Sequence, residues 1–258
     1  ALGLKAAKKR AYLTIARIAR LHRGLTLHLT SERERAEVEA ALGSAVHAFI
    51  SRPHIDVPSR EAPRRDKKSG TASFAFISRI VPKKNLSGAI EVLRTLKGRA
   101  TLSIYGPIED AAYWRRCQGA MSRLPAHVHA EHVGSLPHEG VFDALSRHHF
   151  LLLPTLGENF GHVIAEALCA GCPVILSDQT PWTDLEARGA GWTIALRETQ
   201  RWQETIQRCV DMRSEEFHQM SQRARAYIET VAAESVCAND ERDMFEHAIQ
   251  FERSLNPR

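Results

Sequence analysis

The sequence contains no long apolar run and has few aromatic residues. None of its 258 residues lies in an uninterrupted apolar stretch of about eighteen, the length that a membrane-spanning helix needs. Aromatic residues make up 7% of the chain, hydrophobic residues 43% and charged residues 25%. These proportions are typical of a globular protein with one large or two small domains.

Cysteine is also scarce, with five residues in the whole chain. An odd number in a chain of this length argues against a disulfide-rich secreted scaffold and favours a reduced, cytoplasmic protein. Cys169 and Cys172 stand in C-A-G-C and superficially resemble a redox pair. Because they lie between a helix-like stretch and an apolar strand, we expect them to be packing residues.

The sequence also lacks the usual marks of nucleic-acid and metal binding. Its net charge is +5, and no basic stripe interleaved with aromatic residues is visible, so no nucleic-acid partner is expected. It contains no Asp-x-Asp motif. His127 and His129 would share a strand face, and we expect strand-edge histidines rather than metal ligands.

The first part of the chain, residues 1–57, predicts a helix, a strand, a second helix and a second strand. Residues 4–20 are basic on one helical face and apolar on the other, with no acid. Such a helix can contact an anionic membrane surface or pack its apolar side on its own domain. Ser31 and Glu34 form a capping box for the second helix. Residues 58–70 are charged and contain proline, which is typical of a linker.

From Thr71 onward, strand-like and helix-like runs alternate, which predicts an α/β fold with a doubly wound parallel sheet. After about residue 199 the pattern is helical to the end. We assign residues 71–234 to this domain and residues 235–258 to a C-terminal helix. The expected strands are 72–78, 100–105, 127–133, 149–154, 173–176 and 192–195, and the expected helices are 85–97, 109–121, 138–147 and 159–170.

Ligands of such sheets bind where strands end and helices begin. The loop "SRIVPKKN" follows the first strand of the domain and carries Arg79 and Lys84. A guanidinium and an ammonium group at this place suit a diphosphate. The alternative, a solvated basic loop, remains open for this stretch by itself.

The stretch "GENFGHVIAE", residues 157–166, is more informative. It brings the chain to a helix start, whose free N–H groups favour anions. Glu158 and Glu166 are eight residues apart, which corresponds to roughly 12 Å along a helix. That separation exceeds the ~5–9.5 Å of paired glycosidase carboxylates. It suits contact with the two ends of a nucleoside diphosphate sugar.

These motifs, together with "FISRIVPKKNL", "SIYGP", "VGSLPHEGVFDALSRHHFLLLP" and "GAGWTI", resemble the carboxyl-terminal half of the group 1 glycosyltransferases. Those enzymes have the GT-B fold, use nucleotide sugars and retain the configuration of the transferred sugar. The resemblance covers about residues 71–195. It implies a Rossmann-like, nucleotide-sugar-binding domain with a helical C-terminal tail.

The resemblance also implies roles for individual residues. Glu158 matches the catalytic acid that faces the transferred sugar, and Glu166 matches the glutamate that binds the ribose. Ser78 and Asn159 stand where glycine is frequent in the family, a mild departure that affects loop conformation or sugar preference. The residues that match the donor-binding positions are Arg79, Lys84, Asn159, Phe160, Gly161, His162, Val163, Glu166 and, more weakly, Leu136.

From the resemblance we expect an enzyme that moves a hexose from a nucleoside diphosphate sugar to a glycan or lipid acceptor, with neither metal nor cofactor. Residues 1–57 are too few for the family's complete amino-terminal domain and match only its last elements. The chain could therefore be a non-catalytic nucleotide-sugar-binding module that needs a partner chain or a missing domain. We expect a cytoplasmic location, peripheral to the membrane if residues 4–20 contact it, and a homodimer if the C-terminal helix pairs with a copy.

Two other enzyme classes share the GT-B fold. A GT-B epimerase would use a different set of acids, and a phosphorylase would need a pyridoxal-binding lysine motif that the sequence lacks. Trp182 and Asp184 follow a later strand and either line the sugar pocket or serve in packing.

Overall fold

The computed structural model describes most of the chain and divides it into two units. One unit comprises Ala1–Ile55 with Ala232–Arg258, and the other Asp56–Val231. The predicted boundaries at residues 57, 70 and 234 stay predictions. The described residues are 6–19, 21, 25–30, 32–43, 47–50, 53–60, 62–237 and 240–255.

The larger unit is built on a six-stranded sheet in which every neighbouring pair of strands is parallel. The strand order is β5-β4-β3-β6-β7-β8, so the predicted α/β, doubly wound, Rossmann-like fold is confirmed. The strands are β3 (Thr71–Ile77), β4 (Arg99–Tyr105), β5 (Val128–Gly134), β6 (Phe150–Leu153), β7 (Val174–Ser177) and β8 (Gly191–Ile194).

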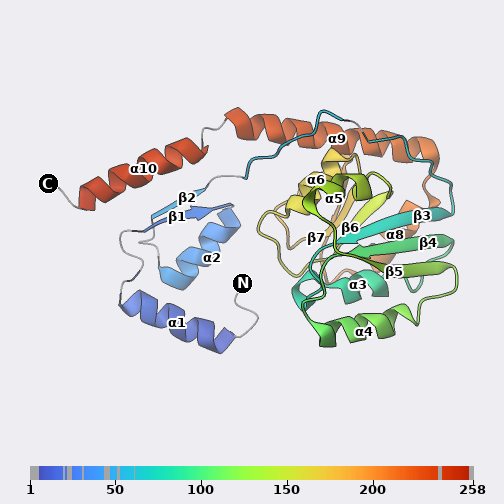
Figure 1. Cartoon of the computed structure of the whole chain (residues 1–258), viewed down its shortest axis with the longest axis horizontal. Coiled ribbons are helices and arrows are strands. Elements are labelled where there is room, and N and C mark those ends of the chain that lie inside the picture. Colours follow the sequence, from blue (N-terminus) through green and yellow to red (C-terminus); the bar gives the residue numbers. More distant parts are fainter. Residues whose placement is uncertain are drawn as a thin grey trace. The chain divides into compact units, whose positions relative to one another are not determined.

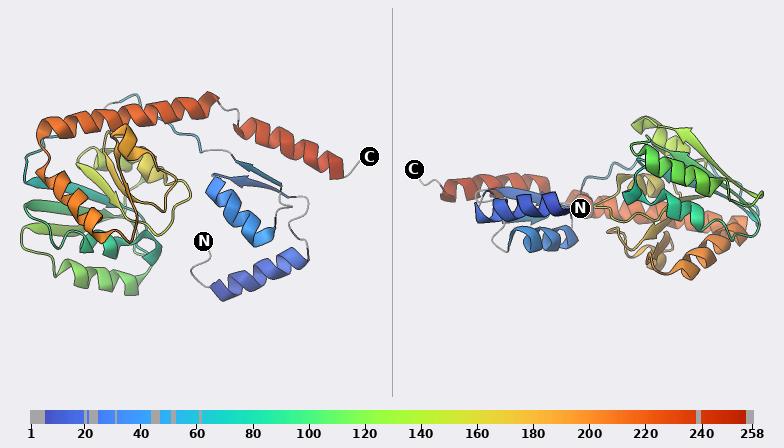
Figure 2. Two further views of the ribbon diagram at one scale, coloured as in Figure 1. Left: turned by 180° about the vertical axis from the view of Figure 1, so that it is seen from behind. Right: turned by 90° about the horizontal axis from the view of Figure 1, so that it is seen from below.

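Helices cover both faces of this sheet. In Figures 1 and 2, α3 and α4 lie together on one side of the strands, and α5 and α6 lie together on the other. Right-handed crossovers dictate this division, because the chain winds outward to β5 and then returns to β6. The helices are α3 (Leu86–Glu91), α4 (Ala111–Met121), α5 (His138–Leu145), α6 (His162–Cys169), α7 (Leu185–Arg188) and α8 (Thr199–Asp211).

Burial along the strands follows their place in the sheet. The central strand β6 reads Phe-Leu-Leu-Leu and is buried throughout, as a strand covered on both faces should be. The edge strand β5 alternates between more and less exposed residues. Phe74 and Phe76 of β3 are fully buried and contribute to the centre of the core.

Two helices differ from the sequence-based expectation, and the first, α3, ends at Glu91 rather than near residue 97. A short 3-10 helix, Pro82–Lys84, precedes α3, and Asn85 between them has a left-handed backbone with φ 56°. Helix α6 begins at His162 rather than near residue 159, because Gly161 has φ 82° and ends the preceding loop. The estimate of separation by helical rise therefore does not apply to Glu158, which lies in that loop.

The segment predicted as a linker packs closely on the larger unit. The Arg65 guanidinium donates to the backbone oxygens of Leu145, His148 and Gly171, and burial lowers its pKa. Lys67 is 3% exposed, and its ammonium donates to the backbone oxygens that end α8. The sequence predicted a charged, proline-containing linker here, and in the structure these two cations donate to backbone carbonyl groups of the larger unit.

The smaller unit contains a parallel pair of strands, β1 (Thr26–Leu29) and β2 (His47–Ile50), joined through α2 (Glu32–Leu42). Ser31 lies outside the described residues. Glu34 reaches back to Thr30, one residue before the predicted cap, and accepts from its amide and hydroxyl. On α1 (Ala6–Ile18), Ile15 and Ile18 are 62% and 77% exposed.

The chain ends in two helices, α9 (Ser214–Cys237) and α10 (Asp240–Leu255). Phe217, Ala224 and Ile228 form one face of α9 and are buried. In α10, Phe245 and Ile249 are 63% and 50% exposed, while Phe251 stacks on His47 of β2. None of the helices in the described parts of the chain has the length and hydropathy that crossing a membrane requires.

Candidate functional site

The connections of the sheet define where a ligand would bind. From β3 the chain adds β4 and β5 on one side and then crosses to β6, β7 and β8 on the other. The carboxyl ends of β3 and β6 therefore flank the point at which the strand order reverses. Loops diverge at this point and leave a crevice in doubly wound folds. Both predicted chemical loops, residues 78–85 and 154–162, leave the sheet here.

The loop after β3 turns Arg79 outward. Its neighbour Ile80 is fully buried and forms a single parallel bridge with Ile108 in the loop after β4. The Arg79 guanidinium lies 3.0 Å from the Glu109 carboxylate, and both side chains are about half exposed. The structure thus pairs Arg79 with an acid that the sequence analysis did not single out.

Lys84 and Glu158 join the two loops. The Lys84 ammonium donates to the Glu158 carboxylate, and the two side chains are only 13% and 17% exposed. The Glu158 amide donates to the backbone oxygen of Gln179, 2.9 Å away. Glu158 is therefore fixed from the loop after β3 and from the loop after β7.

A second set of hydrogen bonds holds the same two loops together. Side-chain Nδ2 of Asn85 donates to the Pro154 backbone oxygen over 2.9 Å. Oδ1 of the same side chain accepts from the Gly88 amide and so caps α3. Thr155 is completely buried, and its hydroxyl donates to the Lys83 backbone oxygen. The Leu156 amide donates to that same oxygen. These bonds give the polar side chains a rigid support.

The start of α6 follows the second of these loops. Gly161 caps the helix, and the Ile164 amide donates back to the Gly161 oxygen. The amides of His162 and Val163 belong to the first turn, where a helix offers N–H groups that its own backbone does not use. A Cβ atom on Gly161 would lie 2.9 Å from Glu158 Cγ. Glycine is therefore needed both for the positive φ and for the placement of Glu158.

Phe160 is supported from behind by Trp182. The indole nitrogen donates to the Phe160 backbone oxygen over 2.7 Å, and the ring centroids are 5.5 Å apart. Trp182 is 5% exposed. Asp184 accepts from the Tyr227 hydroxyl and pairs with Arg188. Of the two alternatives left open, the contacts of Trp182 are those of a packing residue behind the loop, whereas Asp184 is exposed and bonds residues of α7 and α9.

Glu166 lies one turn further along α6. Its carboxylate is 3.2 Å from Nδ1 of His138, the first residue of α5. Burial raises the pKa of the Glu166 carboxyl, and the nearby His138 and His162 oppose that rise. Leu136 is partly buried just before α5, and Asn159 is exposed in the loop before α6.

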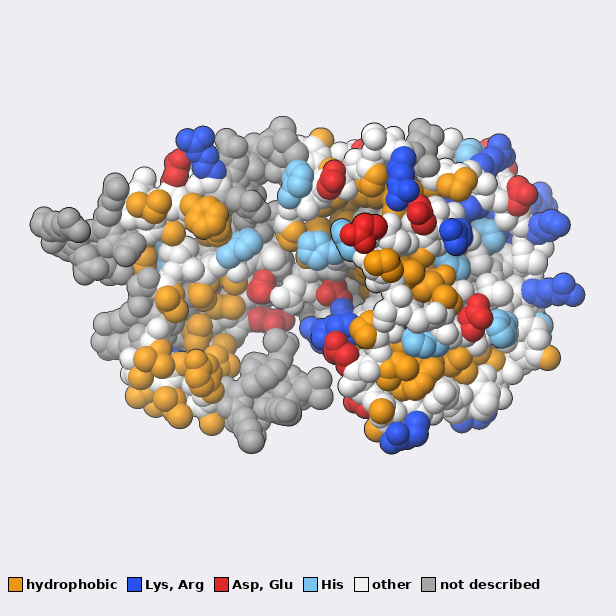
Figure 3. Space-filling model, in the orientation of Figure 1, with side chains coloured by type: hydrophobic (Ala, Val, Ile, Leu, Met, Phe, Trp, Pro, Cys, Tyr) orange, Lys and Arg blue, Asp and Glu red, His pale blue; other side chains and the backbone are white. Residues whose placement is uncertain are grey.

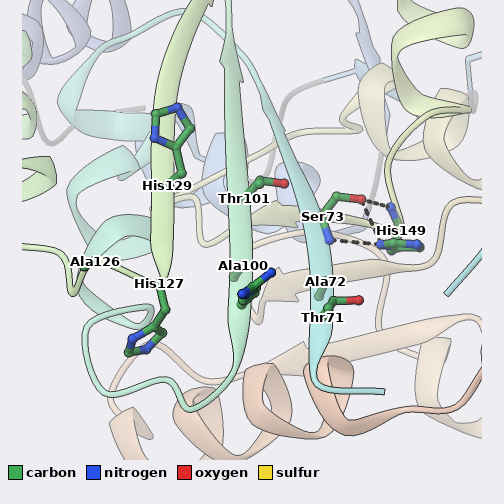
Figure 4. Close-up of a pocket in the computed structure, with 10 residues that line it drawn as sticks. Thr71, Ala72, Ser73, Ala100, Thr101, Ala126, His127, His129 and His149 are labelled. Atoms are coloured by element: carbon green, nitrogen blue, oxygen red, sulfur yellow. Dashed lines mark hydrogen bonds between the residues drawn. The ribbon is translucent and has the colours of Figure 1, made fainter. Parts of the chain in front are cut away.

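A hollow of about 690 Å³ lies at the opposite edge of the sheet, at the amino ends of β3 and β4. Figure 4 shows Ser73 beside His149, with His129 on β5 and His127 just before that strand. His149 Nδ1 accepts from the Ser73 amide, and His127 Nε2 bonds the Leu96 oxygen. Among the described residues no group of three or more acids, histidines or cysteines could hold a metal ion.

The face drawn in Figure 3 and the C-A-G-C cysteines indicate no second chemistry among the described residues. On the described surface of the larger unit drawn in Figure 3, acidic, basic and histidine side chains are interspersed. Cys169 and Cys172 are buried and unpaired. Burial raises the pKa of these thiols to about 11 and about 12, which disfavours the thiolate that redox exchange needs.

The structure thus brings the predicted residues to one edge of the sheet. There Arg79 pairs with Glu109, and Lys84 contacts Glu158 directly. Glu166 contacts His138, which follows the loop predicted to bind the base. The sequence analysis missed Glu109, His138 and Thr155. The strand-end rule that selected the loops covers their positions, but residue type alone did not distinguish them.

Comparison with known proteins identifies the fold and the family. The family model for group 1 glycosyl transferases matches residues 59–227, which is most of the larger unit. No curated protein sequence gives a significant match.

Solved structures of low sequence identity share the fold. HepE from Anabaena, in complex with UDP and glucose, superposes with a TM-score of 0.70 at 18% identity over 89% of this chain and 67% of HepE. Sucrose-phosphate synthase from Thermosynechococcus elongatus gives 0.67 at 17% identity over 98% of this chain and 64% of that chain. TarM from S. aureus, in complex with Fondaparinux, alpha-GlcNAc-glycerol and UDP, gives 0.62 at 15% identity over 87% and 43%.

The chain spans between 43% and 67% of the length of these three proteins. At such identities the likeness shows a Rossmann-like domain of the GT-B type and nothing further. The family model covers well over half of the chain and includes both chemical loops, β3 through α6. On this ground the chain belongs to the group 1 glycosyltransferase family.

Proposed function

We propose that this chain carries the donor site of a retaining glycosyltransferase, which moves a hexose from a nucleoside diphosphate sugar to a glycan or lipid acceptor. One observation carries the proposal. At the reversal point of the sheet, the Lys84–Glu158 pair lies beside the first turn of α6, and Glu166 follows on the same helix.

The diphosphate is the part of the donor that needs positive charge. In the proposal, Lys84 and Arg79 supply the side-chain cations, and the first amides of α6, at His162 and Val163, supply oriented N–H groups. Negative charge grows on the diphosphate as the bond to the sugar breaks. Groups that are already fixed in place stabilise that charge with little reorganisation.

The two glutamates are assigned to the two ends of the donor. Glu166, which is partly buried and acceptor-only when ionised, suits the ribose hydroxyls. Leu136 lies in the loop before α5 and is assigned to the base through its main chain. Asn159, Phe160 and Gly161 form the loop between the glutamates and are assigned to the sugar and its phosphate.

Glu158 is assigned to the transferred sugar and is the proposed catalytic residue. Its carboxylate is fixed by Lys84 and its amide by the loop after β7. Retention would then proceed by attack of the acceptor on the face from which the diphosphate leaves. HepE bound to UDP and glucose and TarM bound to UDP support a nucleotide-sugar donor through their shared fold.

A second candidate function is a nucleotide-sugar-binding module that transfers no sugar by itself. It is favoured by the fraction of the neighbouring proteins that this chain spans, 43% to 67%. The two candidates share the donor site and differ in turnover. They separate when purified chain and donor sugar are assayed for transfer or slow hydrolysis.

Membrane contact through residues 4–20 and pairing of two copies through α10 stay predictions about partners. The exposed Ile15 and Ile18 on α1, and Phe245 and Ile249 on α10, are the side chains on which they rest.

The test of the donor site is calorimetric titration of the chain with UDP, GDP and ADP and with their common sugar conjugates, in EDTA and then with Mg²⁺. We expect one nucleotide to bind with micromolar affinity without metal, and Arg79→Ala and Glu166→Ala to weaken that binding at least tenfold.

Matched surface variants control for general damage. Arg94→Ala removes a cation that pairs with Glu91, and Glu186→Ala removes an acid that pairs with Arg201. Neither lies in the proposed site, and both should bind as the unaltered chain does. Absence of binding by all three nucleotides would contradict the proposed donor site, and binding that requires Mg²⁺ would contradict the metal-free assignment.

A further inference from the structure

The contact between His138 and Glu166 joins two elements with different proposed tasks. His138 is the first residue of α5 and directly follows the loop that contains Leu136. Glu166 lies within α6. Nδ1 of the imidazole is 3.2 Å from Oε1 of the carboxylate, so an Nδ1–H group can donate to that oxygen.

The backbone that carries His138 is fixed, although its ring is open to solvent. Pro137 caps α5 with φ −65° and ψ 155°, and the proline ring itself restricts φ. Val141 and Leu145 of α5 are buried, and α5 packs against α6. The imidazole side chain is 85% exposed and the Glu166 side chain 25%. The histidine therefore approaches the glutamate from the solvent side.

The surroundings of Glu166 shift the pKa of its carboxyl in two opposing directions. Burial raises the pKa of its carboxyl, which disfavours the ionised form that accepts hydrogen bonds. Two groups that face it, His138 from α5 and His162 from the first turn of α6, lower that pKa. His138 is the larger of these two influences and the one in direct contact.

We propose that His138 is a positioning residue for ribose recognition, which orients the Glu166 carboxylate by holding Oε1. This proposal rests on the proposed function. With Oε1 held, Oε2 and the remaining lone pair of Oε1 face the ribose hydroxyls. Because His138 adjoins the predicted base loop, the pair also couples the element that contacts the base to the element that contacts the sugar of the nucleoside.

If the contact were purely structural, His138 would only stabilise the packing of α5 on α6 (a helix tie). Exposed ion pairs contribute little to stability, and α5 and α6 already pack through buried side chains. The two roles differ in what they discriminate. A positioning residue affects ligands that have ribose hydroxyls, whereas a helix tie affects all ligands of the site alike.

The experiment compares nucleotide binding by His138→Ala and the unaltered chain. The ligands are the nucleoside diphosphate that binds best among UDP, GDP and ADP, and its 2′,3′-dideoxy analogue. We expect the ribonucleotide to bind about three- to tenfold more weakly to the variant, which corresponds to one hydrogen bond. The dideoxy analogue should bind both proteins equally. His138→Asn, whose amide can replace Nδ1–H, should restore most of the lost affinity.

Two further variants sharpen the result. In a Glu166→Ala background, His138→Ala should cause no additional loss, because the carboxylate that His138 holds is absent. His129→Ala is the matched control, since His129 is also an exposed histidine beside a carboxylate, 3.8 Å from Glu131. It lies at the opposite edge of the sheet and should leave both affinities unchanged.

The outcomes separate this inference from the proposed function. Equal weakening of the ribonucleotide and the dideoxy analogue, or no weakening of either, overturns the role of His138 and leaves the donor site intact. If the unaltered chain binds no nucleotide, the donor site fails first and the role of His138 fails with it.

Discussion

Lys84 and Glu158 form an ion pair between the loops that follow β3 and β6, the two strands on either side of the reversal point. The pair links the group proposed to hold the diphosphate with the group proposed to face the sugar. Because both side chains are mostly buried, each charge needs the other to compensate for its loss of contact with water. A site built this way keeps its cation and its carboxylate in fixed positions.

The first prediction concerns that dependence. Lys84→Met removes one charge and leaves the Glu158 carboxylate uncompensated, so we expect the unfolding free energy to fall by about 1–3 kcal/mol. The double variant Lys84→Met with Glu158→Gln should be more stable than Lys84→Met alone. Urea unfolding followed by tryptophan fluorescence measures this, and additive effects would show that the pair is uncoupled.

The second prediction separates binding from chemistry at Glu158. Glu158→Gln keeps an oxygen that can accept from Lys84, so nucleotide affinity should stay within about threefold. Transfer or slow hydrolysis of the donor sugar should fall by about a hundredfold or more, because the charge facing the sugar is lost. Calorimetry and product assays test the two halves. Retained turnover would remove Glu158 from the catalytic role.

The sequence predicted the sheet well because its strands are local apolar runs with clear breaks. It also located the loops, since parallel strands place their carboxyl ends at one edge. It could not predict that Lys84 meets Glu158, because that contact requires β6 to lie next to β3. Similarly, His138 reaches Glu166 only through the packing of α5 on α6. Composition did not indicate the bonds of Arg65 and Lys67, because the carbonyl groups that accept from them come from distant segments.

The third prediction follows from the buried carboxyl of Glu166. Its pKa in the folded chain is raised above 4.5, so the folded state holds its proton to a higher pH than the unfolded state does. Stability from this group is therefore lost as the pH rises through that window and stays lower at neutral pH. Glu166→Gln should raise the Tm at pH 7 in the absence of nucleotide.

The control for that prediction is the pH dependence itself. Below pH 4.5 the carboxyl is protonated in both states, and the Tm difference between Glu166→Gln and the unaltered chain should shrink. Glu186→Gln, on an exposed acid, should show no such pattern. A Tm benefit that is equal at all pH values would trace the effect to packing rather than to charge.

The fourth prediction concerns His148, whose pKa burial lowers from 6.5 to about 4. Its Nδ1 is buried without a hydrogen-bond partner, and its Nε2 contacts the Tyr105 hydroxyl. The unfolded chain takes up this proton first on acidification. Stability should therefore fall between pH 6.5 and pH 4 by at most about 3 kcal/mol from this group.

Tryptophan fluorescence can follow that loss in the larger unit alone, because the four tryptophans of the chain all lie within it. His148→Gln should flatten the profile between those pH values. Burial also lowers the pKa of His149, so His149 accounts for part of the acid sensitivity that remains in this variant. His129→Gln changes an exposed imidazole and should leave the profile as it was. An unchanged profile in His148→Gln would exclude His148 as a source of the acid sensitivity.

The last prediction uses two glycines with nearly the same backbone angle. Gly161 has φ 82° and Gly70 has φ 81°, so alanine at either position meets a strain of about 1–2 kcal/mol. A Cβ on Gly161 would also lie 2.6 Å from Ile164 Cδ1 and 2.9 Å from Glu158 Cγ, whereas one on Gly70 meets nothing within 4 Å. Gly161→Ala should therefore lower the unfolding free energy more than Gly70→Ala does.

The same comparison tests whether this turn shapes the donor site. The added methyl group must displace Glu158 or the first turn of α6, so Gly161→Ala should weaken nucleotide binding by about tenfold, which corresponds to one or two lost hydrogen bonds. Gly70→Ala carries the backbone strain without the overlap and should bind normally. If both variants bind the nucleotide with equal affinity, the overlap at Gly161 does not affect the ligand. The conformation of Gly161 would then matter for folding only, because backbone strain is common to both substitutions and the overlap is not.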